Sequence, residues 1–257
     1  MLTFGSRIRG AALLVPAAVL AYPVPAAAQL RVISSGGFSA AYKELIPEFE
    51  RTSGMSVVTA SGSSQGDGPT TIGAQLRAGA LFDVVIFSST GLADLMAQGR
   101  IVQGSERRLA LVLAGIGIRV GSAAPDVGTA DALRQTLRLA KIIATSASSS
   151  NGVAALLTRL GIGDEVTVNV GARYSDANSM VERDEAALCI QPVSEILNMP
   201  GVQLGGTIPA TVRPTGLFLG AIFAGSTRLD DAGRLVAFLA SDAARGAIER
   251  AGMEQPR

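Results

Sequence analysis

The fold class is decided by the stretch LRVISSGGFSAAYKELIPEFERTSG, residues 30–54. It begins with a short apolar run, Leu30 to Ser34, and turns at Gly36-Gly37. Apolar residues then recur at the spacing of an amphipathic helix until Gly54, a residue typical of a helix end. A short strand, a glycine turn and a helix form the repeating unit of parallel sheets, so this stretch predicts an α/β protein.

The same order of strand, polar loop and helix recurs along the chain. Two apolar runs, residues 109–120 and 213–224, are longer than ordinary strands, and we interpret them as the connections through which the chain leaves one lobe and returns. We therefore expect lobe 1 to hold residues 29–112 plus 214–257, and lobe 2 to hold residues 113–213. The expected strands are residues 30–34, 56–60, 84–87, 141–144, 166–170 and 187–190, and the expected helices include residues 70–78, 129–140, 152–160 and 175–183, with two more in 230–250.

Composition excludes several classes of function. The 257 residues are 48% hydrophobic and 17% charged, which excludes a disordered chain. Lys and Arg number 22 against 21 Asp and Glu, so no basic excess favours nucleic-acid binding. There is no histidine and one cysteine, Cys189, which we expect to be a small buried side chain. Histidine-dependent triads, the common nitrogen and sulfur metal sites and internal disulfides are therefore excluded, and we expect no metal and no cofactor.

Residues 1–28 have the features of a secretory signal peptide. Arg7 and Arg9 precede an apolar stretch, residues 11–21, and small residues 26–28 end the segment. The alternative is an uncleaved membrane anchor, but three prolines interrupt a stretch that is already short for a bilayer span. We therefore expect the mature protein in the periplasm.

Four polar loops lie where a predicted strand ends and a helix begins. Ligands of open α/β sheets bind at this edge, and backbone N–H groups at helix starts together with serine hydroxyls can hold an anion without a cation. The alternative is that these residues only cap helices and form turns. Because four such loops are rich in serine, we favour a site for a small oxyanion or carboxylate. The candidate ligand-binding residues in these loops are Ser35, Gly36, Gly37, Phe38, Ser63, Ser64, Ser88, Ser89, Ser149, Ser150, Asn151 and Gly152.

Arg213 is a further candidate for the anion site. It begins the second long apolar run, where a guanidinium could bind a carboxylate with two hydrogen bonds. The alternative is an ordinary charge on a surface strand. The sequence leaves these two interpretations open.

Several segments together resemble one known family. They are residues 32–38, the Gly62-Ser63-Ser64 turn with residues 74–79 and 83–86, residues 191–197, and residues 251–254. In this order they resemble the periplasmic solute-binding proteins of the molybdate-binding type. The resemblance implies a type II periplasmic-binding-protein fold, with mixed, mostly parallel sheets flanked by helices, a two-stranded hinge and an anion between the lobes. It also implies an ABC permease in the inner membrane as the partner, and a monomer.

Two positions depart from the molybdate-binding pattern. Gly37 stands where those proteins have a serine, and Gln191-Pro192 stands where they have a tyrosine, which makes Gln191 the candidate ligand-binding residue of that segment. The loop of residues 64–69 and the pattern from Gln191 to Glu195 are similar to a branch that includes aconitate isomerase. That similarity shifts the expected ligand from a metal oxyanion to a polycarboxylate.

Two functions follow as hypotheses. The favoured one is a binding protein without turnover, because donors and two lobes are all that it needs. The alternative is an isomerase that moves a proton on a tricarboxylate, which requires a base. Without histidine the candidate bases are Glu195, Asp67, Asp176 and Tyr174. A scaffold or adhesion role would leave the serine loops unexplained.

Overall fold

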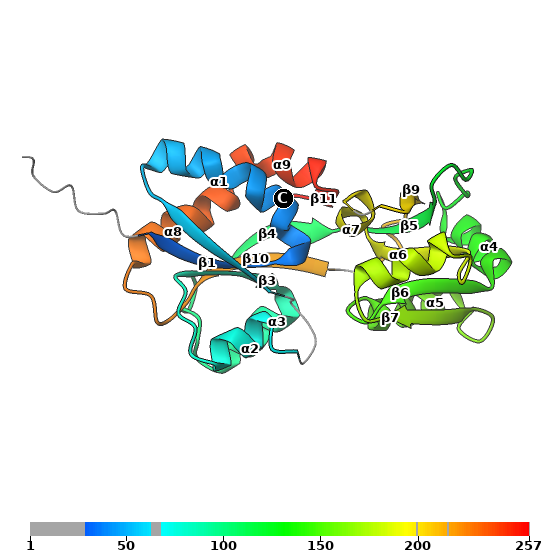
Figure 1. Ribbon diagram of the computed structural model, residues 1–257, viewed down its shortest axis with the longest axis horizontal. Helices are drawn as coiled ribbons and strands as arrows, with labels where there is room; N and C mark the ends of the chain where they lie inside the picture. The colour runs from blue at the N-terminus through cyan, green and yellow to red at the C-terminus, as the bar shows by residue number, and fades with distance from the viewer. Residues whose placement is uncertain (1–28, 63–67, 199, 215, 257) are drawn as a thin grey trace, which may run out of the picture.

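The computed structural model describes residues 29–62, 68–198, 200–214 and 216–256. The chain forms two lobes that lie end to end along the long axis, each with a sheet covered by helices (Figure 1). The predicted signal peptide, residues 1–28, lies outside the described residues. No helix in the described part of the chain is long and apolar enough to cross a membrane.

Lobe 1 is built on a six-stranded sheet with the strand order β11-β4-β10-β3-β1-β2. β1 pairs in parallel with β2 and β3, whereas β10 runs antiparallel to β3 and β4, and β11 antiparallel to β4. The strands are β1 (Leu30–Ser35), β2 (Val57–Gly62), β3 (Val84–Ser88), β4 (Arg107–Val112), β10 (Gly216–Ile222) and β11 (Met253–Glu254).

Helices cover both faces of this sheet. Successive strand side chains point to opposite faces, so Val32 packs with α1, α8 and α9 while Ile33 packs with α2 and α3. Gly54, with a positive φ of 71°, ends α1 as the sequence predicted. The helices are η1 (Gly36–Phe38), α1 (Ser39–Ser53), α2 (Ile72–Arg77), α3 (Ser89–Ala97), α8 (Leu229–Leu239), η2 (Asp242–Ala244) and α9 (Arg245–Arg250).

Lobe 2 is built on a five-stranded sheet with the strand order β7-β6-β8-β5-β9. Leu133, Leu137 and Leu156 pack one of its cores, and the buried Cys189 belongs to the other. The elements are β5 (Ala114–Arg119), α4 (Ala130–Ala140), β6 (Ile142–Ser146), α5 (Ser150–Leu160), β7 (Thr167–Gly171), α6 (Tyr174–Glu182), β8 (Leu188–Pro192), α7 (Val193–Leu197) and β9 (Val202–Thr207).

Two strand connections join the lobes. Leu113 separates β4 of one sheet from β5 of the other, and the chain returns between β9 and β10, where the Ile208 N–H donates to the Ala114 carbonyl at 2.9 Å. The two-stranded hinge and the two-lobe α/β fold are thereby confirmed. The lobe boundaries 29–112 plus 214–257 and 113–213 stay a prediction.

The structure corrects some details of the predicted elements. The sheets are mixed but not mostly parallel, because β10 and β11 in lobe 1 and β5 in lobe 2 run against the direction of the other strands. The run of residues 109–120, predicted as a connection between the lobes, contains the end of β4 and all of β5. The sequence missed α7, whose five residues are too few to show helical spacing, and β9, whose glycines hide strand alternation.

Candidate functional site

The carboxyl ends of the lobe 1 strands bring several predicted residues to one edge of the sheet. Ser35 lies opposite Gly62 in the β1–β2 pair, and Ser88 lies opposite Phe218 in the β3–β10 pair. Because β1 also pairs with β3, the Ser35–Gly37 turn and the Ser88-Ser89 pair share this edge. The predicted Ser63 and Ser64 lie outside the described residues.

One of these serines, Ser88, caps a helix, which is the alternative to ligand binding. Ser88 is the N-cap of α3, and its Oγ accepts a hydrogen bond from the Gly91 N–H at 3.3 Å. Ser89 is the first residue of α3 and is half-buried. Helix capping thus accounts for part of the serine content at this edge.

The corresponding edge of lobe 2 carries the second serine loop. Ser146 ends β6, and its hydroxyl shares a 3.1 Å hydrogen bond with that of Ser148. Ser150 donates to the Ala147 carbonyl at 2.9 Å, a local bond that closes the loop. Asn151 is exposed, and Gly152 lies against Pro214 of the returning connection.

A carboxylate of lobe 2 meets a glycine turn of lobe 1. A Cβ on Gly37 would lie 3.7 Å from Oε1 of Glu195, an ordinary contact between the lobes, and 2.8 Å from Cζ of Phe218 in lobe 1, a clash that glycine avoids. The Phe38 and Phe218 rings belong to the lobe 1 core next to this turn, with their centroids 6.0 Å apart. We call this region the lobe junction and define it as Gly37, Phe38 and Phe218 of lobe 1 with Ser148, Ser149, Tyr174 and Glu195 of lobe 2.

Tyr174 connects the serine loop to Glu195. Burial raises the pKa of its phenol, and the charge of Glu195 raises it further, whereas hydrogen bonds with the hydroxyls of Ser148 and Ser149 act in the opposite direction. The phenol therefore stays neutral and presents an O–H group beside Glu195.

No charged group among the described residues compensates the Glu195 carboxyl. It is half-buried in α7, and no hydrogen bond or ion pair to its carboxyl is found among the described residues. Burial raises the pKa of this carboxyl, because desolvation penalises the ionised form. A carboxyl that is costly to ionise and lies where two lobes meet is a candidate functional group.

Gln191 forms hydrogen bonds with α6, the helix that carries Tyr174. It is buried, and its side-chain N–H group donates to the Tyr174 carbonyl at 3.1 Å and to the Asn178 amide oxygen. Its Oε1 has no hydrogen-bond partner in the described part of the chain. Gln191 therefore holds the start of α6, and its role as a ligand-binding residue stays a prediction.

Two other charged candidates are already paired. The Arg213 guanidinium lies 3.3 Å from the carboxylate of Glu254, next to the hinge. Asp176 accepts from the Arg173 N–H at 2.9 Å and pairs with that side chain, and these bonds lower the pKa of its carboxyl. Asp176 thus stabilises the start of α6 instead of presenting a base. Asp67 lies outside the described residues.

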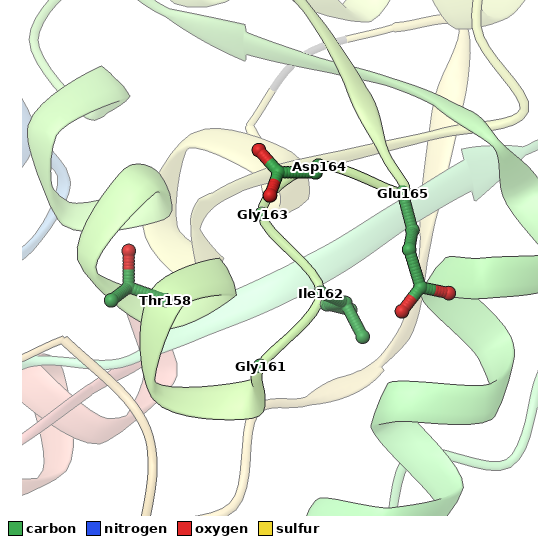
Figure 2. A pocket seen from close by; sticks show the side chains of 6 residues that line it. All are labelled: Thr158, Gly161, Ile162, Gly163, Asp164 and Glu165. Carbon is green, nitrogen blue, oxygen red and sulfur yellow. The ribbon is translucent and has the colours of Figure 1, made fainter.

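A surface hollow of about 440 Å³ lies elsewhere in lobe 2 (Figure 2). Thr158 and residues 161–165, between α5 and β7, line it. This segment precedes β7, so it belongs to the amino end of the parallel strands, opposite the edge at which α/β sheets bind ligands. Glu165 at the hollow is engaged by Arg138 through bonds of 2.7 and 2.8 Å.

Phe218 and Ser148 were missed as site residues. Phe218 lay in an apolar run that gave no sign of which side chain packs against the Gly37 turn. Ser148 lay in a predicted polar loop but was not singled out, because its contact with Tyr174 joins two loops that are distant in the sequence.

The comparisons with known proteins agree with this architecture. Residues 30–254 match the family described as bacterial extracellular solute-binding protein. The chain is 31% identical over 228 residues to aconitate isomerase of a Pseudomonas species, covering 88% of this chain and 87% of that protein. The chain belongs to the family of bacterial extracellular solute-binding proteins.

Two solved structures share the fold. The substrate-binding domain of a putative molybdenum ABC transporter from Clostridium difficile has a TM-score of 0.74 at 14% identity, covering 89% of this chain and 99% of that one. The periplasmic molybdate-binding protein of Azotobacter vinelandii has a TM-score of 0.68 at 21% identity, covering 89% and 100%. These likenesses confirm the two-lobe fold expected from the sequence.

The raised pKa of Glu195 predicts how stability depends on pH. Because the folded protein holds the Glu195 proton more tightly than the unfolded chain, the wild type loses stability as the pH rises from about 4 through the raised folded-state pKa. We expect Glu195→Gln, which cannot ionise, to raise the Tm relative to wild type at pH 8, with the gap closing near pH 4. Thermal unfolding followed by circular dichroism between pH 4 and 8 measures this.

Glu165→Gln is the matched control with the opposite sign. Its hydrogen bond with Arg138 lowers the pKa of Glu165, so ionised Glu165 contributes stability above about pH 4 that the amide loses. A Glu195→Gln variant that is less stable than wild type at pH 8 would contradict the assignment.

Proposed function

We propose that this chain, as a member of the bacterial extracellular solute-binding proteins, captures a small anionic solute between its two lobes. The observation that carries the proposal is the lobe junction. There Gly37 of lobe 1 lies close to the Glu195 carboxyl of lobe 2. The charge of Glu195 acts on the Tyr174 phenol, which also interacts with the hydroxyls of Ser148 and Ser149. The carboxyl ends of strands in both sheets supply these groups, which is where open α/β sheets hold their ligands.

The donors at the junction are uncharged. Hydroxyl and backbone N–H groups provide hydrogen bonds, and α3 and α5, which begin at Ser89 and Ser150, add the partial positive charge of helix starts. None of the residues that define the junction carries a positive charge. The ligand class that such donors fit is a carboxylate or a small oxyanion.

Cellular placement follows from the same proposal. Family membership supports an extracytoplasmic protein, and we assign residues 1–28 as the signal peptide that exports it to the periplasm. An ABC permease in the inner membrane is the partner that would receive the solute. The protein would act as a monomer, because one chain supplies both lobes.

A ligand screen tests anion capture. We expect the Tm to rise with trans-aconitate, tricarballylate, sulfate or molybdate, because a ligand at 100 times its Kd stabilises the fold by about 2.7 kcal/mol. Tyr174→Phe removes one hydroxyl next to the ligand, and the loss of a hydrogen bond to a charged group, about 1.5–3 kcal/mol, predicts a roughly tenfold or greater loss of affinity. Isothermal titration calorimetry gives the Kd values.

The matched control is Thr158→Ala, which removes a hydroxyl from the hollow of Figure 2 and leaves the junction intact. Its Kd should equal that of the wild type. Loss of affinity in Thr158→Ala with none in Tyr174→Phe, or no thermal shift with any of the four anions, contradicts capture at the junction.

A second function is favoured by two observations. The chain is 31% identical to aconitate isomerase over 88% of its length, and Glu195 presents an unpaired carboxyl at the junction. Isomerisation of aconitate requires a base that removes a proton from the methylene carbon. The electron pair moves the double bond along the allyl system, and a proton returns to the former alkene carbon. Glu195 is the group placed to carry that proton.

Incubation with trans-aconitate separates the two functions. Solute capture predicts that the wild type binds trans-aconitate, forms no cis isomer and exchanges no methylene hydrogen with D2O, both of which NMR detects. The isomerase instead predicts formation of the cis isomer. In that case Glu195→Gln should lower the rate by about 10²–10⁴-fold, the usual share of general acid–base catalysis.

A further inference from the structure

We propose that Glu195 binds the captured anion as a neutral carboxylic acid, donating its own proton in a hydrogen bond, so that solute capture takes up one proton. This inference rests on the proposed function, because it requires an anion at the lobe junction. It adds the protonation state in which Glu195 recognises the solute, and it makes pH the condition that regulates affinity.

The position of Glu195 gives it access to the solute. It lies in the first turn of α7, and its Oε1 is 3.7 Å from the point at which a side chain on Gly37 would begin. Lobe 1 therefore contributes glycine backbone and the Phe218 ring to this side of the carboxyl, neither of which carries a charge. The charge of this carboxyl acts on the Tyr174 phenol of α6.

The elements packed against α7 supply no cation for Glu195. The interaction with Tyr174 of α6 is the one electrostatic contact found for its carboxyl among the described residues. On η1 and β9 there are no ionisable groups. On β5 Arg119 pairs with Asp184, on β8 Cys189 donates to Asn178, and on β11 Glu254 pairs with Arg213. Besides Tyr174, α6 carries two acids: Asp176, which pairs with Arg173, and Glu182.

An ionised Glu195 and an anionic solute would repel each other in this setting. Burial already disfavours the ionised carboxyl, and a second negative charge within a few ångströms disfavours it further. The neutral acid instead has an O–H donor, and an anionic oxygen is its strongest acceptor. The solute and the proton therefore bind together, each strengthening the other.

The coupling has a measurable slope. Where the free protein has Glu195 ionised and the complex has it protonated, the association constant falls about tenfold for each unit of pH increase, because one proton enters with the solute. Glutamine at position 195 keeps an N–H donor at every pH. Glu195→Gln should therefore bind the solute with a pH slope shallower by up to one log unit per pH unit.

The experiment uses calorimetric titration with tricarballylate, which has no double bond and cannot isomerise, and with molybdate as an oxyanion. Wild type, Glu195→Gln and the control Glu165→Gln are titrated from pH 5.5 to 8. Titration of the ligand itself cancels, because all three proteins meet the same ligand. Repeating each titration in two buffers of different ionisation enthalpy counts the protons taken up.

We expect the wild type and Glu165→Gln to lose affinity with rising pH in parallel, while Glu195→Gln changes less and binds at least about tenfold more tightly than the wild type at pH 8. Equal slopes in wild type and Glu195→Gln, or weaker binding by Glu195→Gln at every pH, would overturn the inference and leave solute capture standing. Binding of neither probe by the wild type at any pH would remove solute capture and the inference with it.

If Glu195→Gln does not fold, which its circular dichroism spectrum reveals, the proton count of the wild type decides. An uptake that approaches one proton per solute as the pH rises to 8, equal in Glu165→Gln, supports the inference. An uptake near zero throughout the range from pH 5.5 to 8 overturns it.

Discussion

The Glu195 carboxyl of lobe 2 lies against the backbone of Gly37 in lobe 1, with no cation to neutralise it in the described part of the chain. Several other features depend on this contact. A side chain at position 37 would collide with Phe218 of the same lobe, so glycine lets this turn pack against that ring. Glu195 lies on helix α7. The first residues of this helix, Val193 and Ser194, pack closely against Gly252 of lobe 1. The Gln191 side chain donates to the Tyr174 carbonyl and so holds the start of α6.

Uncharged recognition follows from this arrangement. An arginine would bind most anions by charge alone, whereas hydroxyls and backbone N–H groups select by direction and by the number of donors. Arg213, the cation that the sequence offered for this role, is paired with Glu254 beside the hinge. The same junction could bind a polycarboxylate or move a proton on it. In the two proposed functions Glu195 differs in one respect: in the carrier it keeps its proton on oxygen, and in the isomerase it passes a proton to carbon.

The sequence predicted the architecture well because local patterns determine it. Strand, glycine turn and helix in residues 30–54 follow from spacing, and the two long apolar runs mark the hinge. It predicted the site less completely. Ser88 accepts from the backbone of α3 and Ser150 donates to the Ala147 carbonyl, and no pattern distinguishes such a cap from a ligand-binding hydroxyl. The contacts of Glu195 with Gly37 and of Tyr174 with Ser148 join separate lobes or loops, so they depend on tertiary packing.

A crystal structure of the protein grown with tricarballylate tests the central claim most directly. The account predicts ligand density between the Gly37 turn and Tyr174, with a carboxylate oxygen within hydrogen-bond distance of Glu195. Density confined to the hollow lined by Thr158 and residues 161–165, or to an outer surface of either lobe, would contradict it.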